Sequence, residues 1–328
     1  MTRVPRPVRP LAALALLALA ACDGAAPEPA SGGRAVYAAL DAGRTAVALY
    51  TAVPGDPAPP DTLLTRSDLA AVGAALDGAF ASVAWSPDGR SVAFGVVENE
   101  GGAVGVVSAD GRVRALTEMA SATSDPRWSP SGQTILVEKA GFLGAQVGTF
   151  AVAADGAGGA ACVVCADRPL QLGRPALLAG RAAWGRTDDE LAVAVADPAD
   201  AAGSPGRYPT HVYLVDRQTL RPVRRLTAEP VEGAAFALAP GGGAAAFTRG
   251  RGAERVLYAV RPLGSEPVVV ARGADVGPYG WGRDGRLWCV ERGARGLAAF
   301  RVVAPGSGAS VDLGQGAGEV YGADLAAR

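Results

Sequence analysis

The side chains that most often carry enzyme chemistry are scarce in this sequence. His211 is the only histidine among 328 residues, and it lies at the expected start of a strand, in Tyr208-Pro209-Thr210-His211-Val212. As a general base it would need a serine or cysteine partner, and no Gly-x-Ser-x-Gly nucleophile motif is present. One histidine also rules out a histidine-rich metal site. We interpret His211 as a solvated residue at a strand end and expect no catalytic residue, no cofactor and no metal.

The cysteines favour a structural role over catalysis. Cys162-Val163-Val164-Cys165 lacks the second cysteine pair or the histidine of a zinc site, and no strand–helix–strand pattern surrounds it as in redox enzymes. Cysteines at this spacing on a flat strand face opposite ways, so a disulfide between Cys162 and Cys165 requires a local turn. In an oxidising compartment that disulfide is the favoured interpretation, and Cys289 is expected to be a buried free thiol.

Composition and charge favour many short strands and argue against a nucleic-acid partner. The chain contains 45 glycines and 24 prolines, which suit short strands joined by tight turns. Its formal net charge is −1 and its pI is near 6.0, with no clustered basic face of the kind that phosphates require. We therefore expect no nucleic acid among its partners.

The first residues look like an export signal. Arginines at positions 3, 6 and 9 precede the apolar run from Leu11 to Ala21. As a helix this run would rise about 16 Å, too short for a hydrocarbon core of roughly 30 Å, so we interpret residues 1–21 as a signal peptide.

The end of that run resembles the bacterial lipobox. Leu19-Ala20-Ala21-Cys22 implies cleavage before Cys22 and its acylation, which would anchor the chain to a bacterial membrane facing the periplasm. An ordinary signal peptide, with Cys22 a spare thiol, is the alternative. Residues 22–33 contain no large apolar side chain and are expected to be a flexible tether. Asp23 fits inner-membrane retention in enteric bacteria, but the choice between the inner and outer membrane stays open.

One motif recurs along the rest of the chain. Two copies are sharp, Trp85-Ser86-Pro87-Asp88-Gly89 and Trp128-Ser129-Pro130-Ser131-Gly132, and weaker copies begin at Trp184, Phe236 and Trp281. In each, an aromatic residue ends a strand and a Pro or Gly turn starts the next strand. After the first copy, Val92, Phe94 and Val96 alternate with small residues, as expected when both faces of a sheet are covered. The spacing suits four-stranded propeller blades with loop insertions.

The two ends of the chain complete the pattern. Val36 to Leu40, Thr45 to Tyr50 and Thr62 to Thr65 match a blade that lacks its first strand, and Glu319 to Leu325 is a lone strand at the other end. Pairing the ends would remove two open sheet edges. We therefore expect an all-β fold, a six-bladed β-propeller of four-stranded antiparallel blades, closed by the C-terminal strand joining the N-terminal blade.

These repeats resemble those of TolB-like and WD40-like propellers over residues 34–328. TolB carries a separate α/β domain before its propeller, whereas residues 34–80 here are taken up by the first blade, so the role of TolB is not carried over. In this family the innermost strand of each blade lines the central channel. By the repeat alignment, the resemblance places four candidate binding residues at the mouth of that channel: Asp125, Arg127, Glu232 and Tyr279. Ser82 is a weaker candidate.

We therefore expect a non-catalytic propeller that binds an envelope protein or peptide, is held at the membrane through Cys22, and is monomeric. Two alternatives stay open. One is a hydrolase or lyase acting on peptide or sugar polymers, which would need acids and bases clustered at the channel. The other is a purely structural envelope lipoprotein, with contacts through outer strands or the insertion from Pro198 to Pro209.

Overall fold

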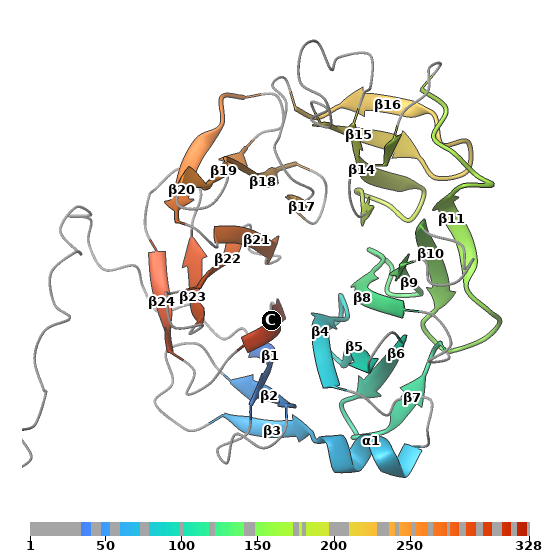
Figure 1. The fold of residues 1–328 in the computed structure, drawn as a ribbon, viewed down its shortest axis with the longest axis vertical. Helices are drawn as coiled ribbons and strands as arrows, with labels where there is room; N and C mark the ends of the chain where they lie inside the picture. Colours follow the sequence, from blue (N-terminus) through green and yellow to red (C-terminus); the bar gives the residue numbers. More distant parts are fainter. Residues whose placement is uncertain are drawn as a thin grey trace, which may run out of the picture.

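The described strands form a ring of twisted sheets (Figure 1). The computed structural model describes residues 34–40, 47–52, 60–72, 79–98, 101–117, 122–140, 148–172, 177–178, 182–196, 210–227, 236–239, 243–250, 254–261, 265–273, 276–281, 287–292, 298–303, 310–315 and 320–326. Within these residues, no helix is long and apolar enough to span a membrane.

The two ends of the propeller meet in one sheet. Its strand order is β25-β1-β2-β3, and β25 runs antiparallel to β1 with Arg34 opposite Ala326 and Tyr37 opposite Ala323. The predicted closure by the C-terminal strand is therefore confirmed. The strands are β1 (Arg34–Leu40), β2 (Val47–Ala52), β3 (Asp61–Leu64) and β25 (Val320–Ala326).

The prediction of six separate four-stranded blades is wrong, because the described strands form five sheets. The second sheet has eight strands: a single parallel bridge between Gly102 and Ala122 joins β6 to β8 and so unites two repeats. Glycine at position 102 has no side chain to hold the two backbones apart. Its strands are β4 (Ala79–Trp85), β5 (Ser91–Glu98), β6 (Gly101–Ser108), β7 (Val113–Ala115), β8 (Ala122–Trp128), β9 (Thr134–Ala140), β10 (Gly148–Ala153) and β11 (Ala161–Cys165).

Three further sheets complete the ring (Figure 1). The third sheet has five strands because its innermost position is divided between two short strands that both pair with β14. Its strands are β12 (Leu177–Leu178), β13 (Ala183–Trp184), β14 (Glu190–Ala196), β15 (Thr210–Asp216) and β16 (Pro222–Arg225). The fourth has β17 (Phe236–Leu238), β18 (Ala245–Arg249), β19 (Val256–Val260) and β20 (Val268–Arg272), and the fifth has β21 (Val276–Trp281), β22 (Leu287–Arg292), β23 (Ala298–Val303) and β24 (Ser310–Gln315).

A short helix was not expected from the sequence. Helix α1 (Arg66–Val72) follows β3, and Thr65 caps it: the Asp68 backbone N–H donates to Thr65 Oγ1, while the Thr65 backbone N–H donates to Asp68 Oδ2 at 2.7 Å. This reciprocal pair is the side-chain signal that begins a helix. The Thr-x-x-Asp spacing is therefore the sequence feature that could have predicted this helix.

The recurring motif forms the predicted tight hairpins. The Ser86 N–H donates to the Ser91 carbonyl at 2.8 Å, and the equivalent Ser129 bond to Thr134 is 2.7 Å. Gly89 and Gly132 sit at φ 67° and 76°, where glycine is favoured. In the fourth copy, Leu238 occupies the position of the aromatic residue, because it pairs with Ala245. The prediction that Phe236 occupies this position is therefore wrong by two residues.

The motif tryptophans join neighbouring repeats. The indole N–H groups of Trp128, Trp184 and Trp281 donate to the carbonyls of Ala84, Arg127 and Ala237, at 3.0, 2.9 and 3.1 Å. Each acceptor lies immediately before the equivalent position in the preceding repeat. Packing between repeats, together with a satisfied indole N–H, therefore explains why an aromatic residue recurs there.

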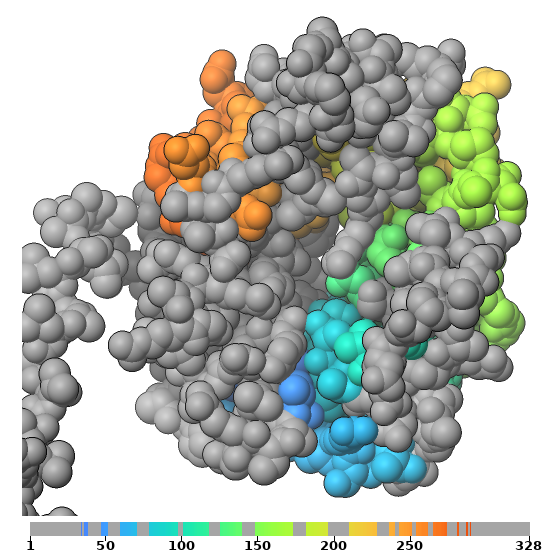
Figure 2. Space-filling view, in the orientation of Figure 1, coloured from blue at the N-terminus to red at the C-terminus, as the bar shows by residue number. Residues whose placement is uncertain are grey.

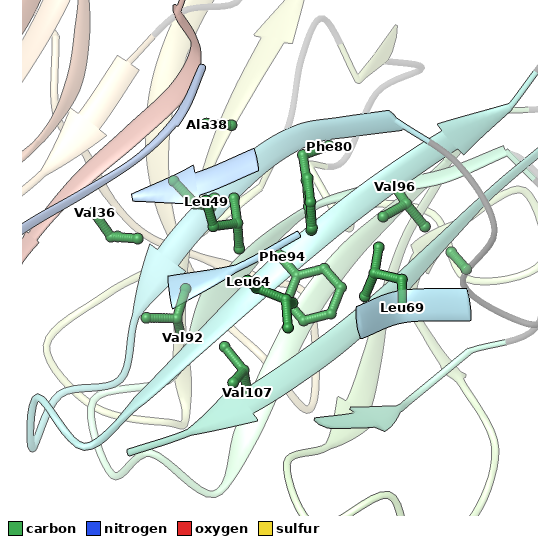
Figure 3. Close-up of a cluster of buried hydrophobic side chains, with 12 residues drawn as sticks. Val36, Ala38, Leu49, Leu64, Leu69, Phe80, Val92, Phe94, Val96 and Val107 are labelled. Atoms are coloured by element: carbon green, nitrogen blue, oxygen red, sulfur yellow. The ribbon is translucent and has the colours of Figure 1, made fainter. Parts of the chain in front are cut away.

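Both faces of β5 are covered, as its alternation predicts. Val92, Phe94 and Val96 pack against the first sheet in the cluster that Figure 3 shows, which includes Leu49. Ala93, on the other face, packs toward the next repeat. Phe94 is fully buried and makes an edge contact with Phe80, with ring centroids 5.5 Å apart. A Cβ at Gly105 would lie 2.6 Å from Phe94 Cζ, so glycine at that position makes room for the ring.

Phe94→Ala should lower the free energy of unfolding by about 4 kcal/mol, because it opens a cavity between the first two sheets. Val97→Ala is the matched control, since Val97 lies on the same strand but is 39% exposed. Urea unfolding followed by tryptophan fluorescence measures both. Equal losses in the two variants would contradict the packing described here.

Candidate binding site on the inner strands

The innermost strands contact one another around the ring. β25 contacts β4, β4 contacts β8, and contacts continue through β13, β17 and β21 back to β25. In Figure 1, the labelled members of this series lie nearest the centre. Residues on these strands therefore meet near one axis although they are far apart in the sequence.

Irregularities in three inner strands coincide with predicted site residues. The register shifts between Phe80 and Ser82 in β4, between Ser124 and Arg127 in β8, and between Pro278 and Gly280 in β21. Asp125 and Tyr279 thus lie within such bulges, which redirect side chains and are common near binding sites.

Asp125 has an unusual backbone conformation. Its φ is 61°, a value that aspartate tolerates better than most residues other than glycine. Its N–H donates to Ser82 Oγ of β4 at 3.1 Å, a contact between two repeats. Ser82, the weaker sequence candidate, therefore helps to hold the bulge.

Arg127 is committed to contacts within the protein. Its guanidinium forms ion pairs with Asp125 (Nη2–Oδ2, 2.9 Å) and Glu138 (Nη1–Oε1, 3.2 Å), and it donates to the Ala182 carbonyl of the next repeat. The side chains of Arg127 and Asp125 are 24% and 23% exposed. Arg127 therefore positions Asp125 and links two repeats.

Glu138 is a member of this group that the sequence did not predict. It lies on β9, accepts from Thr149 Oγ1 at 3.0 Å, and is more buried than its arginine partner. Burial raises the pKa of the Glu138 carboxyl, and the neighbouring Arg127 charge partly offsets this. Burial likewise lowers the pKa of Arg127, opposed by Glu138. The sequence feature that could have identified Glu138 is its charge within the apolar strand that follows the second motif.

The remaining predicted residues are only partly within the described structure. The backbone of Tyr279 is described, whereas its side chain is not, and Glu232 and Cys22 lie outside the described residues. The described part of the candidate site is thus the Asp125–Arg127–Glu138 group with Thr149 and Ser82. Within that part of the chain, no group of three or more His, Cys, Asp or Glu residues is arranged to hold a metal ion.

His211 is buried, so the expectation of a solvated strand-end histidine is wrong. Only 6% of it is exposed, on β15. Arg225 Nη2, from the adjacent outer strand β16, lies 2.8 Å from His211 Nδ1. The pairing of β15 with β16 brings this arginine over the ring.

Cys162 and Cys165 form a disulfide at the outer edge of the eight-stranded sheet. Their Cα atoms are 6.2 Å apart, within the normal range. The pairing of β10 with β11 shifts between Thr149 and Phe150, so the strand is not flat at this point. This bulge supplies the departure from a regular strand that the disulfide needs. Cys289 is buried, as expected.

Comparisons with known proteins show the same fold. The sequence model of the "Lipoprotein LpqB beta-propeller domain" family matches residues 210–322. TolB from Acinetobacter baumannii is 17% identical with a TM-score of 0.64, covering 89% of this chain, and this chain spans 66% of that protein. The putative TolB from Agrobacterium tumefaciens is 14% identical with a TM-score of 0.54, covering 87% of this chain and 90% of its own. Among curated proteins, no match is found.

Other propellers with similar folds have different roles. A chain in a nidogen/laminin complex is 10% identical, with a TM-score of 0.56 and coverage of 90% of this chain and 99% of its own. The tricorn protease is 11% identical with a TM-score of 0.54, covering 85% of this chain and 26% of its own. At such identities the likeness establishes the fold alone. The predicted resemblance to TolB-like propellers is therefore confirmed. The family match shows that residues 210–322 are also similar to the propeller domain of a lipoprotein.

Arg127→Met should lower the free energy of unfolding by about 3 kcal/mol near neutral pH, because it leaves Glu138 without its compensating charge. A carboxyl whose pKa is raised by folding stabilises the fold at low pH and loses that contribution as the pH rises through the folded pKa. The deficit should therefore shrink between about pH 7 and about pH 5.

Urea unfolding at both pH values measures this deficit. Arg112→Met is the control, because the Arg112–Asp110 pair is exposed to solvent and its loss should change nothing measurable. A deficit in Arg127→Met that does not change with pH would contradict the role assigned to Glu138.

Proposed function

We propose that this TolB-like propeller is an exported, lipid-anchored, non-catalytic protein that binds a protein or peptide in the bacterial envelope. The proposal takes residues 1–21 as the signal peptide, Cys22 as the lipid attachment site, 22–33 as the tether and 34–328 as the binding domain. The match to a lipoprotein propeller family and the TolB-like fold support an envelope location.

The observation that carries the binding proposal is the geometry around Asp125. A bulge, a left-handed backbone and an arginine ion pair together place one partly exposed carboxylate on an inner strand. Holding a charged side chain in one conformation before binding reduces the entropy lost on association. Strained backbone of this kind is concentrated at functional sites.

The charge of this group suggests what the partner presents. Asp125 and Glu138 together carry more negative charge than Arg127 neutralises when both carboxyls are ionised. A lysine or arginine side chain, or the amino end of a peptide, would be complementary to it. Tyr279, within the bulge of another inner strand, is proposed as a second contact, with Glu232 as a third.

Asp125→Asn should reduce capture of the partner about tenfold with only a small loss of melting temperature, because asparagine also tolerates the left-handed backbone while losing the charge, and Glu138 still pairs with Arg127. The measurement is cross-linking of the full chain in its native host, followed by mass spectrometry of captured proteins. Asp155→Asn is the control, since Asp155 lies in an exposed outer turn. Undiminished capture by Asp125→Asn and by a triple Asp125→Asn, Glu232→Gln, Tyr279→Ala variant would overturn the assigned site.

Cys22→Ala should abolish incorporation of labelled palmitate and move the protein from the detergent phase to the aqueous phase in Triton X-114 partitioning. The reason is that an acyl chain contributes about 0.8 kcal/mol per buried methylene, whereas residues 22–33 offer no large apolar side chain. Cys289→Ala serves as the control because that thiol is buried. Equal labelling of the Cys22→Ala variant and the unmodified chain would contradict acylation at Cys22.

A further inference from the structure

Two basic side chains lie over aromatic rings at equivalent places in two repeats. Lys139 Nζ, on β9, is 4.6 Å from the centre of the Phe150 ring, and Arg249 Cζ, on β18, is 5.1 Å from the centre of the Tyr258 ring. In both cases the ring belongs to the next strand outward and stands opposite the residue two positions before the cation. We call Lys139 and Arg249 the stacked cations.

The fold does not require a cation at this position. Each stacked cation lies four residues after the residue that pairs with the aromatic position of the motif, and the outward pairing of its strand has no register shift. At the same position β5 has Val96 and β14 has Val195, and both valines are buried. A charge placed where other repeats bury a valine costs hydration free energy. This cost favours a role other than packing for the two cations.

Neither stacked cation has an anionic partner among the described residues. No ion pair or side-chain hydrogen bond joins Lys139 or Arg249 to them, and Arg249 Nε is buried without a hydrogen-bond partner. Arg217, which lies over the Trp184 ring, differs because its Nη1 donates to the Asp188 carbonyl at 3.1 Å. Both stacked cations are partly exposed, so their charges are available to a group from outside.

The two stacked cations lie at the same edge of the ring but form separate sites. Both β9 and β18 run from a motif turn to the opposite edge. The third sheet lies between them along the ring in Figure 1, and their green and orange regions occupy separate areas of the surface in Figure 2. Val137 and Phe247, on the same faces as the cations, pack against the preceding repeats. A side-chain carboxylate reaches such partly covered cations more readily than a flat lipid surface does.

We propose that Lys139 and Arg249 form a surface that binds acidic side chains of a protein partner, with one carboxylate at each stacked cation. A guanidinium stacked on aromatic rings keeps its N–H edge available for two parallel bonds to a carboxylate, and an ammonium donates a charge-assisted hydrogen bond. Two weak contacts to one partner reinforce each other. The surface goes beyond the proposed function and does not depend on it, because it recognises the charge opposite to that recognised by Asp125.

Valine replacement tests the surface with the residue that β5 and β14 carry at this position. Lys139→Val and Arg249→Val should therefore keep or raise the melting temperature. The probe is a fluorescein-labelled peptide of twelve glutamates, and its binding to the full chain in a Cys22→Ser background is measured by fluorescence anisotropy. Each variant should weaken binding about threefold and the double variant about tenfold. Asp125 is unchanged throughout, so the outcome is independent of the site proposed there.

Arg224→Val is the matched control. Arg224 is exposed on β16 and forms no ion pair within the described part of the chain, so its loss changes the net charge equally but should leave binding unchanged. A neutral twelve-residue Gly-Ser peptide should not bind.

Four results would overturn the proposal. The first is absent binding of the glutamate peptide, or binding that the double variant does not diminish. The second is equal weakening by Arg224→Val, which would indicate net charge alone. The third is a fall in melting temperature in both valine variants, which would make the cations structural. The fourth is binding to phosphatidylglycerol vesicles, lost in the double variant, by a chain that does not bind the glutamate peptide, which would indicate a lipid surface instead.

Discussion

The structure depends on the antiparallel pairing of β25 with β1, which joins the two ends of the chain. Without it, the first sheet would lose its innermost strand and the ring would end in two open edges. The inner strands make successive contacts around the whole ring, so closure gives the first and last sheets a neighbour on both sides. The cluster around Phe94 lies beside that pairing, because it includes Val36 of β1.

Contacts between neighbouring repeats then determine the fine structure of the ring. The indole of Trp184 donates to the carbonyl of Arg127, while the guanidinium of Arg127 donates to the carbonyl of Ala182. The same residue thus joins two repeats through its backbone and its side chain. Because Asp125 is paired with that guanidinium, the position of the exposed carboxylate is coupled to the packing of two repeats. The proposed binding residue and the packing of two repeats therefore depend on the same arginine.

Much of the fold could be predicted because the motif has a local cause. Trp-Ser-Pro-Asp-Gly contains the strand end, the turn and the start of the next strand, so the hairpins at Trp85 and Trp128 follow from a few adjacent residues. The fourth copy was aligned on Phe236, two residues from the true equivalent, because Leu238 is not aromatic. The union of two repeats into one sheet could not be predicted, since it depends on how closely Gly102 approaches Ala122.

The sequence by itself determined the repeat and the closure of the ring, because these follow from local turn chemistry and from counting strands; the inner-strand position of Asp125 followed from the resemblance to TolB-like propellers together with the repeat alignment. Only the tertiary structure decided that Arg127 is held by Glu138 and that Arg225 covers His211. Those contacts join strands whose relative register and twist are set by packing, and residue types alone do not reveal them. Burial, which raises the pKa of the Glu138 carboxyl, is a property of the assembled ring.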